Sequence, residues 1–595
     1  MLLINKKVFR ESNERNKWVF VMTFLNSVKS IVATVATTMF VAAVLFLAPI
    51  PAAHAYDFER IASGGLGDAE NNYPHSMTTL KKCLFVGGSR SWPYRVGMLI
   101  GGGGLGALGL GFTEPVFPDV PKEQAQFIPP APGGGVYSLA DREAWANDMA
   151  AKIFRYCERG PNKGWTEVYQ SQVVTTGGGT QFWPVVHGYR WAKNFKPAGK
   201  GPTNKPAAYF GGGFGFDAES GGLGGNPDQF VSISRLLVRT FDGENFEEVP
   251  TPFGMGSDAS MMVAIGGRFC VSSTLSSLGA VIHCTTNGHP QTADDWELVA
   301  SLSNPPEMAP GANTGVFSIE KFKGHLWAGA SNDTGWQLWK CEAAPANMNP
   351  GCWKLMVAYG GGDMENSTPA DLEVFKNHLY VGQFNLPTNL ADLDDLKAAE
   401  IYRVNNRGKC QLVVGDLEPH TAPPNDANPN LLCNRNALSG LSAGYGNPYN
   451  IYTVVLRQYK GMLFAGSLDI SDALSQIDAV SFGDLDPDEV RALLEPFFGH
   501  DLWVSFNGKH FFPLNLSGFD NGSNFWLRTI QPVRGKVYFG SANAEHGFEV
   551  YRSPMLAPQL YAVNELVSSL TDVLVAVGVI DQQQADDIWI NASPW

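Results

Sequence analysis

The segment FSIEKFKGHLWAGAS, residues 317–331, consists of two apolar stretches separated by the turn residues Lys323 and Gly324. Apolar stretches on both sides of a short Gly-containing turn are typical of a β-hairpin. Two further apolar stretches follow closely, QLWKC at 337–341 and CWKLMVA at 352–358. This part of the chain therefore predicts four short antiparallel strands in sequence.

The four-strand pattern recurs along the chain, as in repeat architectures. Counterparts of the first hairpin are TTLKKCLFVGG (78–88), AAYFGGG (207–213), MMVAIGGRFCVSS (261–273), LEVFKNHLYVGQF (372–384), YTVVLRQYKGMLFAGSL (452–468) and IQPVRGKVYFGSA (530–542). Third strands follow, such as IFRYC (153–157) and FEVYRS (548–553), and most copies have a fourth, such as GWTEVY (164–169). Seven copies of four antiparallel strands predict an all-β protein, a seven-bladed β-propeller with a central channel.

The last copy has no fourth strand after residue 553. The stretch DFERIAS, residues 57–63, matches the fourth strand CWKLMVA, and the alignment continues without a gap from Phe58 against Trp353 to Gly87 against Gly382. We therefore expect DFERIAS to complete the last blade and close the ring, which leaves no blade edge unpaired.

The blades resemble exported propellers related to Kelch and sialidase-type repeat proteins, over residues 56 to about 555. A Kelch-like glycine pair stands at Gly87-Gly88 and at Gly211-Gly212, while other copies read SS, AG or GQ. The sialidase-type Asp-box is absent from the turns between third and fourth strands. The resemblance therefore implies the fold and transfers no catalytic residues.

The ends of the chain differ from the repeats. A basic segment and the apolar run IVATVATTMFVAAVLFLAPI precede Ala53-His54-Ala55, which predicts an export signal over residues 1–55; an uncut membrane anchor is the alternative. The propeller is expected over 56–557. Residues 558–595 have helical periodicity and predict a C-terminal helical hairpin, which docks on the propeller or mediates self-association.

Charge and cysteine content indicate the compartment. The formal net charge is −14, which argues against nucleic acid as a partner. Eight cysteines in an exported chain favour disulfides, and we expect a periplasmic, cell-surface or extracellular protein without a stable membrane span after signal cleavage. Their spacing predicts the pairs Cys83–Cys157, Cys270–Cys284, Cys341–Cys352 and Cys410–Cys433.

Loops on one face of the propeller are the expected functional region. Long insertions follow the second strand at 89 to about 150, about 213–231, about 385–398 and about 468–500. Binding sites on rigid scaffolds often lie in such loops. Polar and aromatic residues just before the first strands are the candidate ligand-binding residues, although Asn and Asp are also ordinary turn residues: Asn72, Asp258, Asn313, Asn366, Asp371, Asn447, Tyr449, Asn450, Asn524 and Trp526.

Candidate chemistry centres on His75 and Tyr73. A propeller lyase needs a base near the axis and a cation, such as Arg90 or Arg528, that neutralises a substrate carboxylate. A sialidase-like site needs several arginines, for which Arg190 and Arg457 are further candidates beside Arg528.

Motifs for cofactors and metals are weak. GLGALG at 104–109 lies in an insertion and lacks the context of a dinucleotide fold, and no cofactor is expected. DLDPD at 484–488 lacks the Gly and Glu of an EF-hand and is expected to cap a helix. Calcium in a loop or in the channel is compatible with the acidic composition.

Two functions follow from these observations. We expect an exported propeller whose loop-rich face binds a glycan, peptide or protein. The alternative is a carbohydrate-active enzyme, a polysaccharide lyase or glycoside hydrolase, with its site at the channel mouth.

Overall fold

The hairpin expected at 317–331 is formed by β16 (Asn313–Phe322) and β17 (His325–Asn332) in a computed structural model of the chain. Its turn residues Lys323 and Gly324 both have positive φ, at 51° and 86°. Two consecutive residues of this kind form a turn whose twist matches that of the paired strands. The pairs Gly266-Gly267, Lys460-Gly461 and Arg534-Gly535 repeat this geometry in other hairpins.

The structure describes residues 58–90, 139–148, 150–176, 181–186, 188–198, 204–213, 237–252, 261–273, 280–286, 288–303, 313–385, 396–475 and 486–553. All of them belong to the unit Phe58–Ser593. The predicted signal and C-terminal helices, as well as most of the predicted loop insertions, lie outside the described residues.

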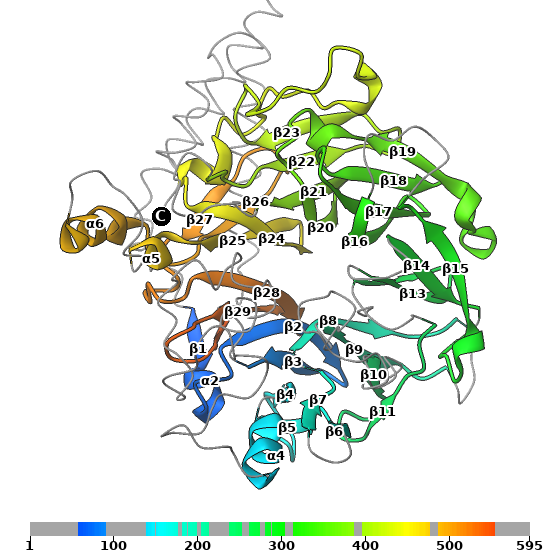
Figure 1. The fold of residues 1–595 in the computed structure, drawn as a ribbon, viewed down its shortest axis with the longest axis vertical. Coiled ribbons are helices and arrows are strands. Elements are labelled where there is room, and N and C mark those ends of the chain that lie inside the picture. The colour runs from blue at the N-terminus through cyan, green and yellow to red at the C-terminus, as the bar shows by residue number, and fades with distance from the viewer. Residues whose placement is uncertain are drawn as a thin grey trace, which may run out of the picture. The chain divides into compact units, whose positions relative to one another are not determined.

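The strands form antiparallel four-stranded units in which consecutive strands pair (Figure 1). The first units along the chain are β2 (Tyr73–Leu80), β3 (Cys83–Ser89), β4 (Lys152–Cys157) and β5 (Gly164–Gln170); β8 (Gly188–Phe195), β9 (Ala207–Gly213), β10 (Leu237–Thr240) and β11 (Phe246–Glu248); and β12 (Met262–Ile265), β13 (Arg268–Ser273), β14 (Val281–Thr285) and β15 (Trp296–Ser301). β16 and β17 continue into β18 (Gln337–Cys341) and β19 (Trp353–Val357).

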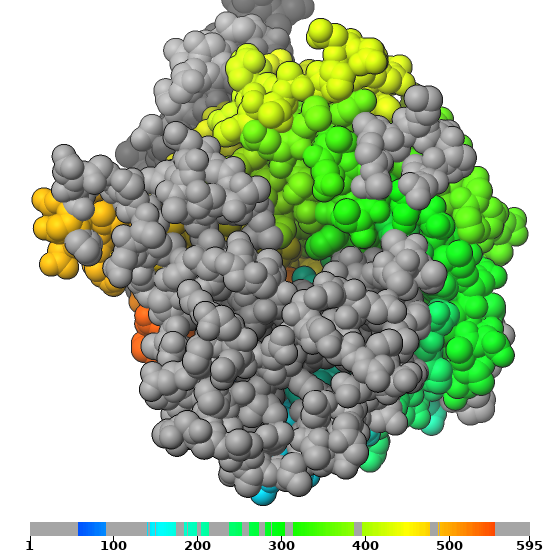
Figure 2. All heavy atoms as spheres, viewed as in Figure 1, coloured from blue at the N-terminus to red at the C-terminus, as the bar shows by residue number. Residues whose placement is uncertain are grey.

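The later units follow the same order. They are β20 (Thr368–Phe375), β21 (His378–Phe384), β22 (Ile401–Val404) and β23 (Cys410–Val414); β24 (Asn450–Tyr459), β25 (Met462–Asp469), β26 (Leu502–Ser505) and β27 (Phe512–Asn515); and β28 (Trp526–Val533), β29 (Lys536–Ala542), β30 (Glu549–Arg552) and β1 (Glu59–Ala62). In the sphere view, green and yellow segments, which include the units β16–β19 and β20–β23, form one edge of the visible face (Figure 2).

Other elements lie in the connections between strands, within a unit or between units. They are the strand pair β6 (Val173–Thr176) and β7 (Gln181–Pro184), the helices α2 (Gly64–Gly67), α4 (Leu139–Asp148), α5 (Ser471–Leu474) and α6 (Pro487–Leu494), and 3₁₀ turns at 293–295, 345–347, 350–352, 359–361, 429–431, 443–446 and 495–497. Asp486 caps α6 in a capping box with Glu489, which confirms the helix cap predicted at DLDPD. Among the residues the structure describes, no helix is long and apolar enough to cross a membrane.

First strands of neighbouring units contact one another. These contacts join β2 to β8, β8 to β12, β12 to β16, β16 to β20, β20 to β24, β24 to β28 and β28 back to β2. The faces of the units pack together in the same way, since Trp327 and Leu338 share a core cluster with Leu372 and Tyr402 of the next unit. The fold is therefore propeller-like and mostly antiparallel β, as the sequence predicts.

Glycines in the second strands allow this close packing. A Cβ atom at Gly382 would lie 2.5 Å from the Thr453 carbonyl oxygen of the next unit, and one at Gly540 would lie 2.7 Å from Met77 Cε. Real Cβ atoms do not approach backbone atoms so closely, so a larger residue at Gly382 would force the two units apart.

The N-terminal strand pairs with the last unit. Glu59, Arg60 and Ala62 of β1 are in antiparallel register with β30. Arg60 forms an ion pair of 2.9 Å with Glu549, and the Trp165 indole of β5 donates to the Ile61 carbonyl at 2.8 Å. The pairing confirms that DFERIAS supplies a fourth strand to the last repeat.

The four disulfides match the sequence prediction. Cys83–Cys157, Cys270–Cys284, Cys341–Cys352 and Cys410–Cys433 are all formed. Each bridge joins strands or adjacent segments of a single unit, so it stabilises that unit and does not tie the units together.

Removal of β1 should destabilise the whole assembly of units. A chain that begins at Gly64 should melt at least about 5 °C below one that begins at Phe58, because the last unit loses its strand and its contacts with β5. Differential scanning calorimetry of the two chains tests this. Equal melting temperatures would show that the β1–β30 pairing is not needed for stability.

Candidate functional site

A cavity of about 290 Å³ lies where the first strands meet. Its wall includes residues of β2, β8, β12, β16, β20, β24 and β28, so every first strand contributes to it. This cavity is bordered by Arg190, Arg457 and Arg528 together with Glu320 and Asp371. Charged groups gathered in a cavity mark it as the candidate site.

β-Bulges aim side chains into this cavity. The pairing of six first strands with their second strands shifts register near the same place. One bulge residue of each of these six strands borders the cavity, and these residues are His75, Arg190, Phe317, Ala370, Val454 and Arg528. Bulges commonly re-aim side chains beside functional sites.

The polar bulge residues come from adjacent strands. β2 carries His75 and contacts both β8, which carries Arg190, and β28, which carries Arg528. The corresponding residues of β16, β20 and β24 are apolar. One side of the cavity is therefore cationic and the other apolar, and we call His75, Arg190 and Arg528 the arginine end.

Aromatic rings support the arginine end. The Arg190 guanidinium lies 4.3 Å from the centre of the Trp191 ring, and that of Arg528 lies 5.7 Å from the centre of the Trp526 ring. Rings of Tyr73 and Tyr452 each lie 5.1 Å from that of Trp526. Stacking of this kind holds the two cations in place without neutralising their charge.

His75 is held by its neighbours. Its Nδ1 is 2.5 Å from the Ser89 hydroxyl, and its ring packs edge-on against Tyr73 with centroids 4.5 Å apart. A Cβ atom at Gly188 would lie 1.8 Å from Ser89 Oγ, so the side chain of any other residue there would displace the hydroxyl. The ring orientation of His75 thus depends on the contact between β3 and β8.

Burial and charge set the protonation of this pair. Burial, together with Arg528 and Arg190, holds the pKa of His75 well below its usual value. Burial raises the pKa of Tyr73 well above its usual value, although Arg528 opposes the effect. At neutral pH His75 is therefore a neutral imidazole and Tyr73 a neutral phenol.

Three carboxylates lie further along the first strands, and we call Glu320, Asp371 and Glu373 with Arg457 and Lys193 the acidic end. Arg457 donates to Glu373 at 3.0 Å. Asp371 accepts the Leu372 and Leu456 amides at 2.9 and 2.8 Å, so it links β20 to β24. Electrostatic effects of Glu320 reach all three of Asp371, Glu373 and Arg457.

Burial makes the acidic end sensitive to pH. It raises the pKa of Asp371 to about 6, against the opposing effect of Arg457. It raises the pKa of Glu373 to about 8, again against Arg457. At neutral pH Glu373 is mostly protonated and Asp371 mostly ionised.

The structure brings several predicted site residues to one place. His75, Asp371 and Arg528 border the cavity, while Tyr73 and Trp526 pack directly behind it. Arg90 does not border the cavity. Its side chain is 1 % exposed, and the guanidinium group donates to Asp68, Asn71 and Asp148 at 2.5, 2.7 and 2.8 Å.

The predicted asparagines form a recurring clamp inside the units. The Asn side chain donates to a carbonyl six residues earlier and to a carboxylate at or just before the third strand: Asn366 to Gly360 and Glu400, Asn450 to Gly444 and Asp501, and Asn524 to Gly518 and Glu549. Each clamp fixes the start of a first strand. These bonds use amide hydrogens that a ligand would otherwise receive, and a ligand role for these residues stays a prediction.

A second recurring hydrogen bond joins an asparagine before a first strand to a donor nineteen residues later in the chain. Asn332 donates to Asn313 at 3.1 Å, Asn543 to Asn524 at 3.0 Å and Arg90 to Asn71 at 2.7 Å. This constant spacing is visible in the sequence, and a ligand role for Asn313 and Asn524 stays a prediction.

The remaining predicted residues lie elsewhere. Asn447 donates to Asp469 at 2.8 Å, the Tyr449 ring packs against Phe497, and the Asn72 carbonyl accepts from the Asn543 amide. Asp258 lies outside the described residues.

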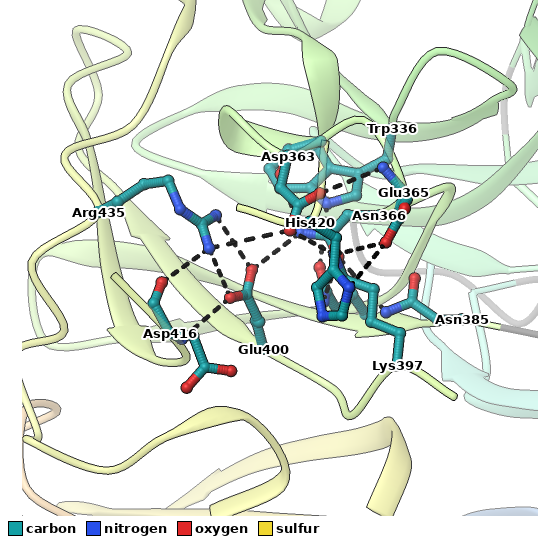
Figure 3. Close-up of polar contacts among 12 residues, drawn as sticks. Trp336, Asp363, Glu365, Asn366, Asn385, Lys397, Glu400, Asp416, His420 and Arg435 are labelled. Atoms are coloured by element: carbon teal, nitrogen blue, oxygen red, sulfur yellow. Dashed lines mark hydrogen bonds and ion pairs between the residues drawn. The ribbon is translucent and has the colours of Figure 1, made fainter. Parts of the chain in front are cut away.

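One clamp extends into a larger polar cluster (Figure 3). Arg435 donates to Glu400 at 2.7 Å, buried Lys397 pairs with Asp363, and His420 lies 3.3 Å from Glu365. A hollow of about 260 Å³ adjoins Lys397, Glu400 and His420. Because its buried charges are paired with one another, we interpret the cluster as a network that stabilises the fold.

Metal ligands are not grouped in the part of the chain that the structure describes. No three His, Cys, Asp or Glu side chains there are placed to hold an ion. The calcium expectation for loops outside these ranges stays a prediction.

Comparisons with known proteins reach only the level of general likeness. No family model and no curated protein matches the chain. Among solved structures, a polysaccharide lyase, Uly1, is 9 % identical with a TM-score of 0.38, covering 82 % of this chain and 91 % of that chain. A Trypanosoma rangeli sialidase in complex with sialic acid is 10 % identical with a TM-score of 0.33, covering 68 % and 60 %. A luciferin-regenerating enzyme is 10 % identical with a TM-score of 0.29, covering 61 % and 92 %. Scores this low carry no argument about activity.

The pKa of Glu373 predicts that stability falls as pH rises. A carboxyl whose pKa is higher in the folded state contributes stability that is fully present below its unfolded pKa and is lost as pH rises through its folded value, here about 8. Between the two values each pH unit changes the free energy of unfolding by about 1.4 kcal/mol.

The variant Glu373→Gln should show a weaker dependence. Its free energy of unfolding, measured in urea from about pH 5 to pH 9, should fall less with pH than that of the unmodified chain. Glu244→Gln, at an exposed glutamate, is the matched control. Parallel pH profiles for Glu373→Gln and the unmodified chain would contradict a raised pKa at Glu373.

Proposed function

We propose that the chain is a seven-bladed β-propeller whose central cavity binds a carboxylate-bearing glycan. The observation that carries this proposal is the placement of His75, Arg190 and Arg528 at bulges of three adjacent first strands. The β1–β30 pairing and the cycle of first-strand contacts support the blade count.

Two arginines in one cavity favour an anion. Guanidinium groups bind carboxylates through charge-assisted hydrogen bonds, which are stronger than hydrogen bonds between neutral groups. Within the described residues, no carboxylate forms an ion pair with Arg528, so this cation can receive one from a ligand. A ligand carboxylate would also gain from the low dielectric of a partly closed cavity.

The opposite wall favours a sugar over a small inorganic anion. Phe317, Ala370 and Val454 provide an apolar surface facing the cavity, and Tyr452 adds an aromatic ring. A sugar ring offers apolar C–H faces with polar edges, so a uronic acid unit matches both walls. The disulfides fit an exported protein, which meets such polysaccharides.

Elimination chemistry is a second candidate because His75 is neutral and borders the cavity. A neutral imidazole beside two arginines suits the removal of the proton next to a carboxylate, since the arginines stabilise the negative charge that develops. As His75 accepts this proton, the electron pair forms a C=C bond, the C–O bond to the leaving sugar breaks, and the leaving oxygen takes a proton from the imidazolium or from water. Tyr73 lies behind His75 and serves to orient it.

Binding should depend on the arginine end. Titration calorimetry with galacturonate oligomers should show that Arg528→Gln and Arg190→Gln each weaken binding at least about tenfold, because a charge-assisted hydrogen bond is lost. Arg407 is exposed and does not border the cavity, so Arg407→Gln should bind like the unmodified protein. Equal affinity for acidic and neutral oligosaccharides would disprove a carboxylate site.

Elimination should depend on His75. If the protein cleaves the acidic polysaccharides that it binds, ultraviolet absorbance of unsaturated ends should appear and should fall by roughly a hundredfold or more in His75→Gln. Binding by this variant should persist, because the arginines remain. A protein that binds uronates yet produces no unsaturated ends is a binding protein only.

A further inference from the structure

The acidic end shares the cavity with the arginine end. Lys193, Glu320, Asp371 and Arg457 border the same cavity as Arg190 and Arg528. Tyr452 borders the same cavity and is within electrostatic reach of both groups, because Arg528, Arg190 and Asp371 all influence its pKa. On β8, Arg190 of the arginine end and Lys193 of the acidic end are three residues apart, a separation of about 10 Å at roughly 3.3 Å per residue.

The net charge of the acidic end depends on how many of its carboxyls carry a proton. Groups from four strands face one another here: Lys193 of β8, Glu320 of β16, Asp371 and Glu373 of β20, and Arg457 of β24. With all three carboxyls ionised the end carries one excess negative charge. With Asp371 and Glu373 protonated it carries one excess positive charge, so the sign of the local field reverses.

We propose that the acidic end is a second anion subsite, in which Arg457 and Lys193 receive a further carboxylate of the same ligand once Glu373 and Asp371 are protonated. The ligand class is therefore an oligosaccharide with carboxylates on separate units, and not a single uronic acid. This inference rests on the proposed binding of a carboxylate at the arginine end.

The geometry of Arg457 supports this role. The Arg457 side chain is 34 % exposed and borders the cavity. It donates through Nη1 to Glu373 and through Nε to the Ile530 carbonyl. Protonation of Glu373 weakens the ion pair, while the bond to Ile530 still holds Arg457 in place. The cation then becomes available to a ligand carboxylate without leaving its position.

Proton uptake must accompany the second contact. A ligand carboxylate near Glu373 disfavours an ionised glutamate, so occupation of the subsite raises the affinity of Glu373 for its proton. Because coupling is reciprocal, protonation of Glu373 raises the affinity of the subsite for the ligand carboxylate by the same factor. Burial raises the pKa of Asp371 to about 6 and that of Glu373 to about 8, so both carboxyls change protonation near neutral pH.

The experiment compares galacturonate with digalacturonate by titration calorimetry at about pH 5 and pH 9, where both ligands are ionised. The preference for digalacturonate over galacturonate should be roughly tenfold larger at the lower pH. Near neutral pH, runs in two buffers of different ionisation enthalpy should reveal proton uptake with digalacturonate and less with galacturonate.

Variants assign the effect to the acidic end. At about pH 9, where Asp371 is still ionised, Glu373→Gln should show a larger digalacturonate preference than the unmodified protein. Lys193→Gln should reduce the preference at the lower pH while leaving galacturonate binding unchanged. Thermal melting of each variant reports whether it is folded, and Arg407→Gln is the control for loss of a charge elsewhere.

The outcomes separate the two proposals. If neither ligand binds at either pH, the carboxylate site itself is wrong. If both ligands bind with a preference that is the same at both pH values, or a preference that Glu373→Gln does not alter, the second subsite is wrong and the arginine end stands alone.

Discussion

The pairing of β1 with β30 is the interaction on which the arrangement of the other units depends. It joins Glu59, Arg60 and Ala62 to residues near 550, and it allows β2 to continue directly from the last unit into contact with β28. Ion pairs of Arg60 with Glu549 and of Arg552 with Glu59 reinforce the pairing. Because a cavity lined by all first strands exists only when β28 and β2 are adjacent, this contact also assembles the arginine end.

Burial of charge is the second constraint. The arginine end and the acidic end place cations and carboxyls in one partly enclosed space, where an unpaired charge is costly. The guanidinium groups of Arg190 and Arg528 lie beside tryptophan rings, and Arg457 donates to Glu373. Because the Glu373 carboxyl can gain or lose its charge, we propose that Arg457 serves an anion site that depends on protonation.

Regular repetition and local departure from it have different meanings in this fold. Asn366, Asn450 and Asn524 form the same clamp between the first and third strands of three copies. His75, Arg190 and Arg528 occupy bulge positions where other copies have Phe317, Ala370 or Val454. In a repeat protein the shared residue maintains the repeat, and the residue that differs between copies is free to serve a site.

Sequence alone was sufficient for the strands, the hairpin turns, the disulfides and the fourth-strand role of DFERIAS, because these follow from local periodicity, turn chemistry and internal similarity. It also singled out His75, Tyr73, Arg528 and Trp526, but it grouped them with Arg90 and the asparagines. Only the tertiary structure separated these sets, since register shifts and the order of the units around the cavity decide which side chains point inward. The acidic end was likewise visible only in three dimensions, because its five residues come from four strands and no short stretch of sequence contains them.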